Sequence, residues 1–174
     1  MKRIMLDLET LGREPSAIIL SIGLAVIDGD KITDKCQWFP SLADQQTRGR
    51  TTGTSTILWW AEHLKRGNET SAFLPDYTRE TPYVVIADIR ELLTTADEVW
   101  CNGTDFDLPI LKDFFSMWGA GWPVDYWKHR DFRTLKNLPA CRPIYEGLKP
   151  GHGKPHDALE DALFQAKVLI EYFR

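Results

Sequence analysis

The sequence predicts an α/β protein with a mixed central β-sheet whose first three strands are antiparallel and which is flanked by α-helices. Two observations support this fold class. Three apolar, strand-like segments open the chain, and a hairpin-type turn separates the second from the third. After them, segments with helical periodicity alternate with a short apolar run, which is typical of layered α/β proteins. The chain has 174 residues and no repeat or linker, so it fits a single domain spanning residues 1–174.

The opening strands are expected at residues 3–8, 17–28 and 31–39, where apolar residues dominate. The second and third are joined by the turn Asp-Gly-Asp at residues 28–30. Residues 42–55 are polar and contain two glycines, so they are predicted to form a surface loop.

Three segments in the middle of the chain are expected to form helices: residues 56–66, residues 81–95, where apolar residues recur at roughly helical spacing, and residues 108–118. A short buried strand is expected at residues 97–101, and the Asn-Gly pair that follows it acts as a breaker. Residues 119–150 are rich in Gly, Pro and aromatic residues, which favours a loop with short helical pieces around residues 133–138.

The last helix is expected at residues 157–173. Asp157 and Glu160 have the spacing of a capping box, in which Asp157 caps the first turn and Glu160 reaches back to it. His156 would then precede the helix, so its ring should be free to swing over a site that Asp161 lines.

Composition excludes several classes of protein. A net charge of −4 argues against non-specific binding of nucleic-acid backbones by a basic surface. A nucleic-acid enzyme remains compatible, because metal ions can neutralise both an acidic site and the substrate phosphate. The three cysteines, Cys36, Cys101 and Cys141, are far apart and argue against a disulfide framework or a zinc knot. No apolar stretch reaches transmembrane length, and we expect no signal peptide, no membrane partner and a cytoplasmic location.

Two carboxylates interrupt the apolar first strand. Asp7 and Glu9 alternate with Leu6 and Leu8, so a strand of period two points both acids to one face. Buried carboxylates are unfavourable without a cation, and two like charges this close repel each other. The pair therefore predicts a divalent metal site and a metal-dependent enzyme.

Three short motifs rich in acidic residues occur along the chain. They are Asp-Leu-Glu-Thr at residues 7–10, Asn-Gly-Thr-Asp-Phe-Asp at residues 102–107, and a histidine followed five positions later by aspartate at residues 156–161. Together they resemble the motifs of the DEDDh exonucleases, which are 3′–5′ nucleases with the ribonuclease H-like fold. With the Trp-Trp pair at residues 59–60 and Asp-Phe-Arg-Thr at residues 131–134, the chain is most similar to small stand-alone bacterial and phage exoribonucleases. Those enzymes are in turn similar to the nuclease domain of exodeoxyribonuclease VIII.

The resemblance implies one general base, His156, and four metal ligands: Asp7, Glu9, Asp107 and Asp161. The second motif is one residue longer than the commoner form, which leaves Asp105 as the alternative to Asp107. Asp107 is preferred because it follows an aromatic residue and opens a helix, and Asp105 is then a turn residue.

These residue types suit phosphodiester hydrolysis. Four carboxylates can hold two Mg²⁺ or Mn²⁺ ions about 3.5–4 Å apart, where one activates a water and the other stabilises the leaving 3′-oxygen. Neutral His156 can accept the proton of that water, because its unperturbed pKa lies near neutrality. His152 is the alternative base, although a solvated loop histidine is its simpler interpretation. His63 and His129 fit no motif and are interpreted as surface or packing residues.

Four further residues are candidates for substrate contact: Thr10, Leu11, Trp60 and Arg133. Adjacent tryptophans point about 100° apart on a helix, so one can pack in the core while the other stacks on a terminal base. Which of Trp59 and Trp60 does so is open, as is core packing of both. Thr10 and Leu11 lie where similar enzymes meet the terminal nucleotide. Arg133 is a candidate for phosphate binding, with a surface salt bridge as its alternative.

The leading hypothesis is a 3′–5′ exoribonuclease that acts on the 3′ end of single-stranded RNA or on 3′ overhangs. An exodeoxyribonuclease is the nearest alternative. A catalytically silent nucleic-acid-binding module and a small-molecule phosphatase or nucleotide hydrolase are the others. Because related stand-alone nucleases are often homodimers, a homodimer is the expected assembly.

Overall fold

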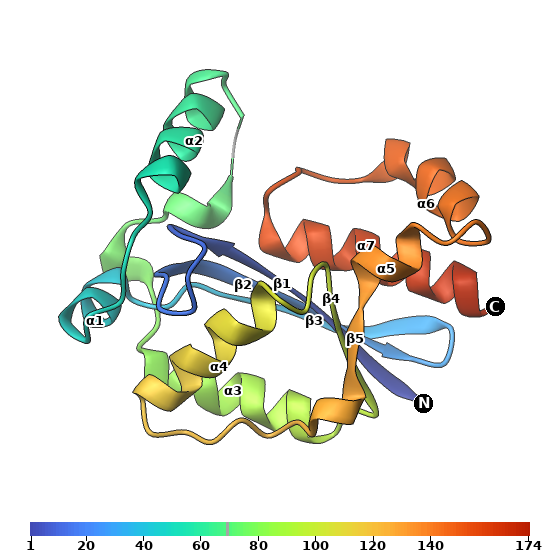
Figure 1. Cartoon of the computed structure of the whole chain (residues 1–174), viewed down its shortest axis with the longest axis horizontal. Coiled ribbons are helices and arrows are strands. Elements are labelled where there is room, and N and C mark those ends of the chain that lie inside the picture. The colour runs from blue at the N-terminus through green and yellow to red at the C-terminus, as the bar shows by residue number, and fades with distance from the viewer. Residues whose placement is uncertain (69) are drawn as a thin grey trace.

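The computed structural model describes residues 1–68 and 70–174 and contains a five-stranded mixed β-sheet with the strand order β3-β2-β1-β4-β5 (Figure 1). β1 pairs with β2 and β2 pairs with β3 in antiparallel fashion, whereas β4 is parallel to β1 and β5 is parallel to β4. The predicted fold class is therefore confirmed. The strands are β1 Lys2–Thr10, β2 Ile19–Asp28, β3 Lys31–Trp38, β4 Glu98–Cys101 and β5 His129–Asp131.

Seven α-helices lie among the described residues, and none of them is long and apolar enough to cross a membrane. Short 3₁₀ turns occupy residues 71–73, 76–78, 126–128 and 149–151. The α-helices are α1 Leu42–Thr47, α2 Thr54–Lys65, α3 Pro82–Thr94, α4 Asp107–Met117, α5 Phe132–Lys136, α6 Arg142–Leu148 and α7 Ala158–Phe173.

Helices cover both faces of the sheet (Figure 1). On one face, α3 and α4 pack against Ile4, Leu6 and Leu8 of β1 and against alternate residues of β2. On the other face, α7 packs against Met5 of β1 and Ala25 of β2. Burial on both faces explains why β2 is an almost continuous apolar run rather than an alternating one.

Two sequence predictions were wrong. Residues 42–55 contain α1, whose residue Gln45 is buried and exchanges two hydrogen bonds with the backbone of Ile19, at 2.8 and 2.9 Å. A polar residue thus occupies a core position, which hydrophobic periodicity cannot reveal. The second error concerns residues 119–150, which contain β5 and α6 as well as the expected α5. β5 has three residues, too few to carry a periodic pattern.

A glycine in β2 allows α7 to approach the sheet closely. Gly23 pairs with Asp7 in the register of β1 and β2. A Cβ atom at Gly23 would lie 2.1 Å from both the carbonyl carbon and the carbonyl oxygen of Ala158, the first residue of α7. Only a glycine fits at this position. Because Gly23 has no side chain, the first turn of α7 can lie directly beside Asp7.

Candidate active site

Four carboxylates from three elements line one cavity of about 410 Å³. Asp7 and Glu9 come from the carboxyl-terminal half of β1, where their alternation with leucines turns both toward the α7 face. The other two open helices, Asp107 at the first residue of α4 and Asp161 in the first turn of α7. The structure therefore brings all four predicted metal ligands together, whereas Asp105 lies exposed in the preceding turn.

Hydrogen bonds from neighbouring groups hold two of these carboxylates, Asp107 and Asp7. Asp107 is 3% exposed, and its Oδ1 accepts a hydrogen bond of 3.2 Å from the backbone N–H of Leu8. The Oδ1 atom of Asp7 accepts one of 3.2 Å from Nε2 of Gln165. Gln165 lies four residues after Asp161, so the same face of α7 supplies both.

Burial raises the pKa of every one of these carboxyl groups. Loss of hydration is the largest cause for Glu9, whose pKa rises to about 9, and repulsion by Asp161 and Asp107 adds to it. Burial likewise raises the pKa of Asp107 to about 7, against the opposing effect of the Leu8 N–H. The pKa values of Asp7 and Asp161 are raised for the same leading reason. A cation among these groups would relieve both the repulsion and the buried charge.

The chemistry of the donors fits a hard divalent cation. Carboxylate oxygens predominate, with one imidazole, which suits Mg²⁺ or Mn²⁺. One ligand atom each of Glu9, His156 and Asp161 lies within 4.8 Å of the others. The donor set and the mutual repulsion of its charges thus agree with a bound metal.

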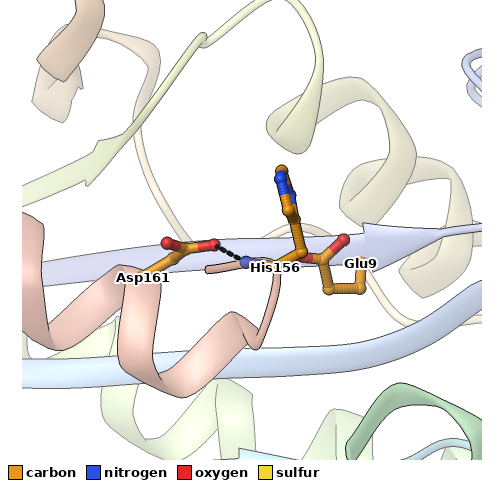
Figure 2. Close-up of side chains that lie close together, drawn as sticks. All are labelled: Glu9, His156 and Asp161. Carbon is orange, nitrogen blue, oxygen red and sulfur yellow. Dashed lines mark hydrogen bonds between the residues drawn. The ribbon is translucent and has the colours of Figure 1, made fainter. Parts of the chain in front are cut away.

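His156 lies between Glu9 and Asp161 (Figure 2). Its φ angle is +63°, in the left-handed region that residues other than glycine seldom adopt. In this conformation its backbone N–H donates to Oδ2 of Asp161 at 3.0 Å. The ring contacts the rings of Trp59 and His63, with centroids 4.8 and 5.3 Å away.

The cap of α7 has half of its expected form. The Asp157 side chain accepts from the backbone N–H groups of Leu159 and Glu160 at 3.2 and 3.4 Å, as predicted. The prediction that the Glu160 side chain accepts from the backbone N–H of Asp157 was wrong, because this N–H donates to the carbonyl of Lys154. The Asp157 carboxylate also accepts from Gln37 Nε2, at 3.1 Å, which ties the cap to β3.

His152 is not the solvated loop histidine that was expected. Its side chain is 18% exposed, and Nε2 lies 2.7 Å from Oδ1 of Asp161. Its ring stacks on Phe164 with the centroids 4.3 Å apart and an interplanar angle of 16°. Two histidines, His152 and His156, therefore contact the carboxylate of Asp161, which is one of the candidate metal ligands.

Three of the four predicted substrate-contact residues line the cavity: Thr10, Trp60 and Arg133. Leu11 instead packs with Trp60 and Leu20 in a small apolar cluster. Trp60 is 3% exposed and its indole N–H donates to the carbonyl of Thr10 at 2.9 Å, whereas the neighbouring Trp59 is 44% exposed on the cavity wall. Arg133 donates to the carbonyl of Asn102 at 2.8 Å.

The sequence named His152 only as an alternative base, and two polar residues of the cavity, Lys136 and Gln165, were not predicted from it. Lys136 lines the cavity, and its Nζ donates to Oδ1 of Asn102 at 3.1 Å. Lys136 follows Arg133 by three residues on α5, so one helix presents two cations. Gln165 could have been predicted, because it follows Asp161 by four residues and so lies on the same face of the helix. No sequence pattern in residues 119–150 indicated a role for Lys136.

Comparison with known proteins identifies the family. The family described as the 3′–5′ exoribonuclease Rv2179c-like domain matches residues 2–173. A protein of Enterobacteria phage T4 named exodeoxyribonuclease is 23% identical over 205 residues, which cover 95% of this chain and 88% of the phage protein.

Solved structures share the fold at low sequence identity. The nuclease domain of 3′hExo, described as a DEDDh family member bound to rAMP, has a TM-score of 0.67 and 12% identity over 99% of this chain and 91% of that one. E. coli exonuclease I in complex with a dA16 oligonucleotide has a TM-score of 0.69 and 15% identity over 98% of this chain. Cell-death related nuclease 4 has a TM-score of 0.66 and 15% identity over 99% of this chain. The chain spans 63% of nuclease 4 and 40% of exonuclease I.

The fold is the ribonuclease H-like fold of these exonucleases, as the sequence motifs predicted. The match to the family covers almost the whole chain, including every residue of the carboxylate site. The chain therefore belongs to the Rv2179c-like exoribonuclease domain family and is a 3′–5′ exonuclease.

Proposed function

We propose that this exonuclease removes nucleoside 5′-monophosphates from the 3′ end of single-stranded RNA or of 3′ overhangs. One observation carries the proposal: four buried or half-buried carboxylates and His156 converge on a single cavity. A cavity of about 410 Å³ is within the ~300–1,000 Å³ range of small-ligand pockets, so it suits one terminal nucleotide rather than a duplex. The family description favours RNA, whereas the name of the phage relative makes DNA the alternative.

In this proposal two Mg²⁺ or Mn²⁺ ions are held by the four carboxylates, Asp7, Glu9, Asp107 and Asp161. When bound, such ions supply charge stabilisation at the scissile phosphate and an activated water. The carboxylates must be ionised to serve, and the hydrogen bonds of Leu8 and Gln165 favour their ionised form and fix their direction.

His156 is the proposed general base. Burial lowers the pKa of its imidazole, and the nearby His63 and His152 lower it further against the opposing effect of Asp161. The ring is therefore neutral at pH 7 and able to accept a proton. Its contacts with Trp59 and His63 hold it at the edge of the cavity.

The proposed substrate contacts divide between bases and phosphates. Trp59, the exposed member of the tryptophan pair, would stack on the terminal base. The buried Trp60 would hold Thr10 in place through its hydrogen bond to the Thr10 carbonyl. Arg133 and Lys136 would contact the phosphates, since both cations line the cavity. A homodimer is part of the proposal, with the exposed apolar residues Ile57 and Leu58 of α2 as a candidate contact.

Incubation with 5′-end-labelled RNA and DNA of one sequence, with Mg²⁺, Mn²⁺ or EDTA, tests the proposal. We expect a stepwise ladder from the 3′ end of the RNA with either metal and none with EDTA. A stronger ladder on DNA would assign the alternative substrate. Hydrolysis of free nucleotides without polymer degradation would indicate a small-molecule hydrolase, and no cleavage under any condition would indicate a binding module.

Matched variants connect the activity to the site. Asp161→Asn should abolish the ladder, because it removes one of the four carboxylate charges. Asp125→Asn, an exposed acid outside the cavity, should leave the ladder unchanged. Size-exclusion chromatography with light scattering measures the assembly, and a monomeric mass would refute the homodimer.

A further inference from the structure

We propose that His152 is a positioning residue that fixes the orientation of the Asp161 carboxylate toward the metal site. The inference rests on the proposed function, because it assigns Asp161 to a bound cation. His152 follows the 3₁₀ turn Lys149–Gly151, and its Nε2 lies 2.7 Å from Oδ1 of Asp161. It belongs to none of the three motifs that mark the active site.

Nε2 of His152 is buried and makes no hydrogen bond among the described residues, although it lies 2.7 Å from Oδ1 of Asp161. A buried polar atom normally has a partner. Among the described residues, Oδ1 of Asp161 is the acceptor that lies close to this nitrogen. The two side chains are 18% and 17% exposed, so water competes weakly for the contact. The surroundings therefore direct this nitrogen to Asp161.

Phe164 fixes the histidine ring in this place. The two rings stack with centroids 4.3 Å apart and an interplanar angle of 16°. Phe164 is 4% exposed and is held in turn by Tyr145, whose ring centroid lies 5.3 Å away. Phe164 also follows Asp161 by three residues on α7, so it lies on the same side of the helix. Helix α7 therefore carries both the Asp161 carboxylate and the Phe164 ring that holds His152 beside it.

The contact leaves Asp161 able to bind a cation. Its Oδ1 meets His152 and its Oδ2 accepts the backbone N–H of His156 at 3.0 Å. A carboxylate offers about four lone-pair directions, so each oxygen keeps one for a metal. Side chains that contact a metal-binding carboxylate without binding the metal themselves orient that carboxylate, and their loss weakens metal binding. His152 and the His156 backbone together restrict rotation of the carboxylate.

The role differs from that of a general base. His156 has its ring at the edge of the cavity against Trp59, whereas Nε2 of His152 faces a carboxylate oxygen. Removing a positioning residue should weaken metal affinity, and saturating metal should restore the rate. Removing a base should lower the rate at every metal concentration.

Mn²⁺ binding measured without substrate, by titration calorimetry or by the EPR signal of free Mn²⁺, tests the inference on the full chain. His152→Phe keeps a ring on Phe164 but removes the nitrogen, and we expect a Kd for Mn²⁺ that is ~10–100-fold higher. His152→Gln keeps an N–H donor near the position of Nε2 and should remain within a few-fold of the unaltered protein. His129→Ala is the matched control, because His129 lies on β5 against Trp122. Thermal melting confirms that each variant is folded, and His152→Ala replaces His152→Phe if the larger ring prevents folding.

Activity at rising Mn²⁺ completes the test. Recovery of kcat for His152→Phe at saturating Mn²⁺, with no recovery for His156→Ala, supports the inference. An unchanged Kd for His152→Phe overturns it, whether or not the rate falls. Absence of Mn²⁺ binding by the unaltered protein also overturns it. If the unaltered protein binds Mn²⁺ but degrades no polymer, the proposed function fails while the measured Kd values still decide the role of His152.

Discussion

Replacing Gly23 with alanine would place a methyl group against the backbone of α7. Carbon atoms in contact need at least ~3.5 Å, and the added Cβ would lie 2.1 Å from the Ala158 backbone, so the two must separate by about 1.4 Å. Backbone atoms inside a helix cannot rotate away as a side chain can. We expect the free energy of unfolding to fall by about 3 kcal/mol, at the upper end of the usual effect of overpacking.

The same shift would damage catalysis separately from stability. Ala158 precedes Asp161 by three residues, and Gly23 lies opposite Asp7, so moving α7 moves Asp161 away from the carboxylates of β1. A misplacement of ~1 Å in a catalytic site can lower the rate ~10²-fold. We expect a loss of that size in kcat under conditions where Gly23→Ala is fully folded.

Urea denaturation followed by circular dichroism measures the first effect, and single-turnover cleavage of labelled RNA measures the second. Gly147→Ala is the control, because nothing lies within 4 Å of a Cβ there and alanine favours helix α6. If Gly23→Ala were as stable and as active as the parent, the close approach of α7 would not determine the geometry of the site.

Four other outcomes are expected. His156→Ala should bind Mn²⁺ but lower kcat ~10²–10⁴-fold in single-turnover assays, and an active variant would contradict its role as base. Trp59→Ala should raise KM ~5–150-fold, the equivalent of ~1–3 kcal/mol of stacking, with little change in melting temperature. Trp60→Ala should instead lower the free energy of unfolding by ~3–5 kcal/mol in urea titrations, because it empties a core position. Without metal, the raised pKa values of Glu9 and Asp107 mean that protonation of these two groups stabilises the folded protein. Their contribution to the free energy of unfolding is complete below about pH 4. It is lost as the pH rises through about 7 for Asp107 and about 9 for Glu9. Melts in EDTA and in Mg²⁺ between pH 6 and 9 should therefore show stabilisation by metal that grows with pH, and a constant or shrinking difference would refute the assignment.

Regular patterns in the sequence predicted the framework of the site. Alternation along β1 placed Asp7 and Glu9 on one face, and the spacing of Asp157 and Glu160 predicted the N-cap that leaves His156 outside α7. Periodicity gives relative directions but not the absolute rotation of a helix. It therefore separated Trp59 from Trp60 without telling which is buried.

Contacts between distant segments account for what could not be predicted. Gln45 occupies a core position because the backbone of Ile19 needs partners, and no local pattern records that need. His152 reaches Asp161 through a loop whose path is set by packing on Phe164. These pairings arise only once the chain has folded.

The left-handed conformation of His156 has a practical consequence for capturing a substrate complex. The residue contributes its backbone N–H to Asp161 independently of its ring, so a variant lacking the imidazole can keep that contact if its backbone tolerates a φ angle of +63°. Asparagine and glycine accept this region more readily than alanine. His156→Asn and His156→Gly are therefore the preferred inactive forms for co-crystallisation with an uncleaved oligonucleotide.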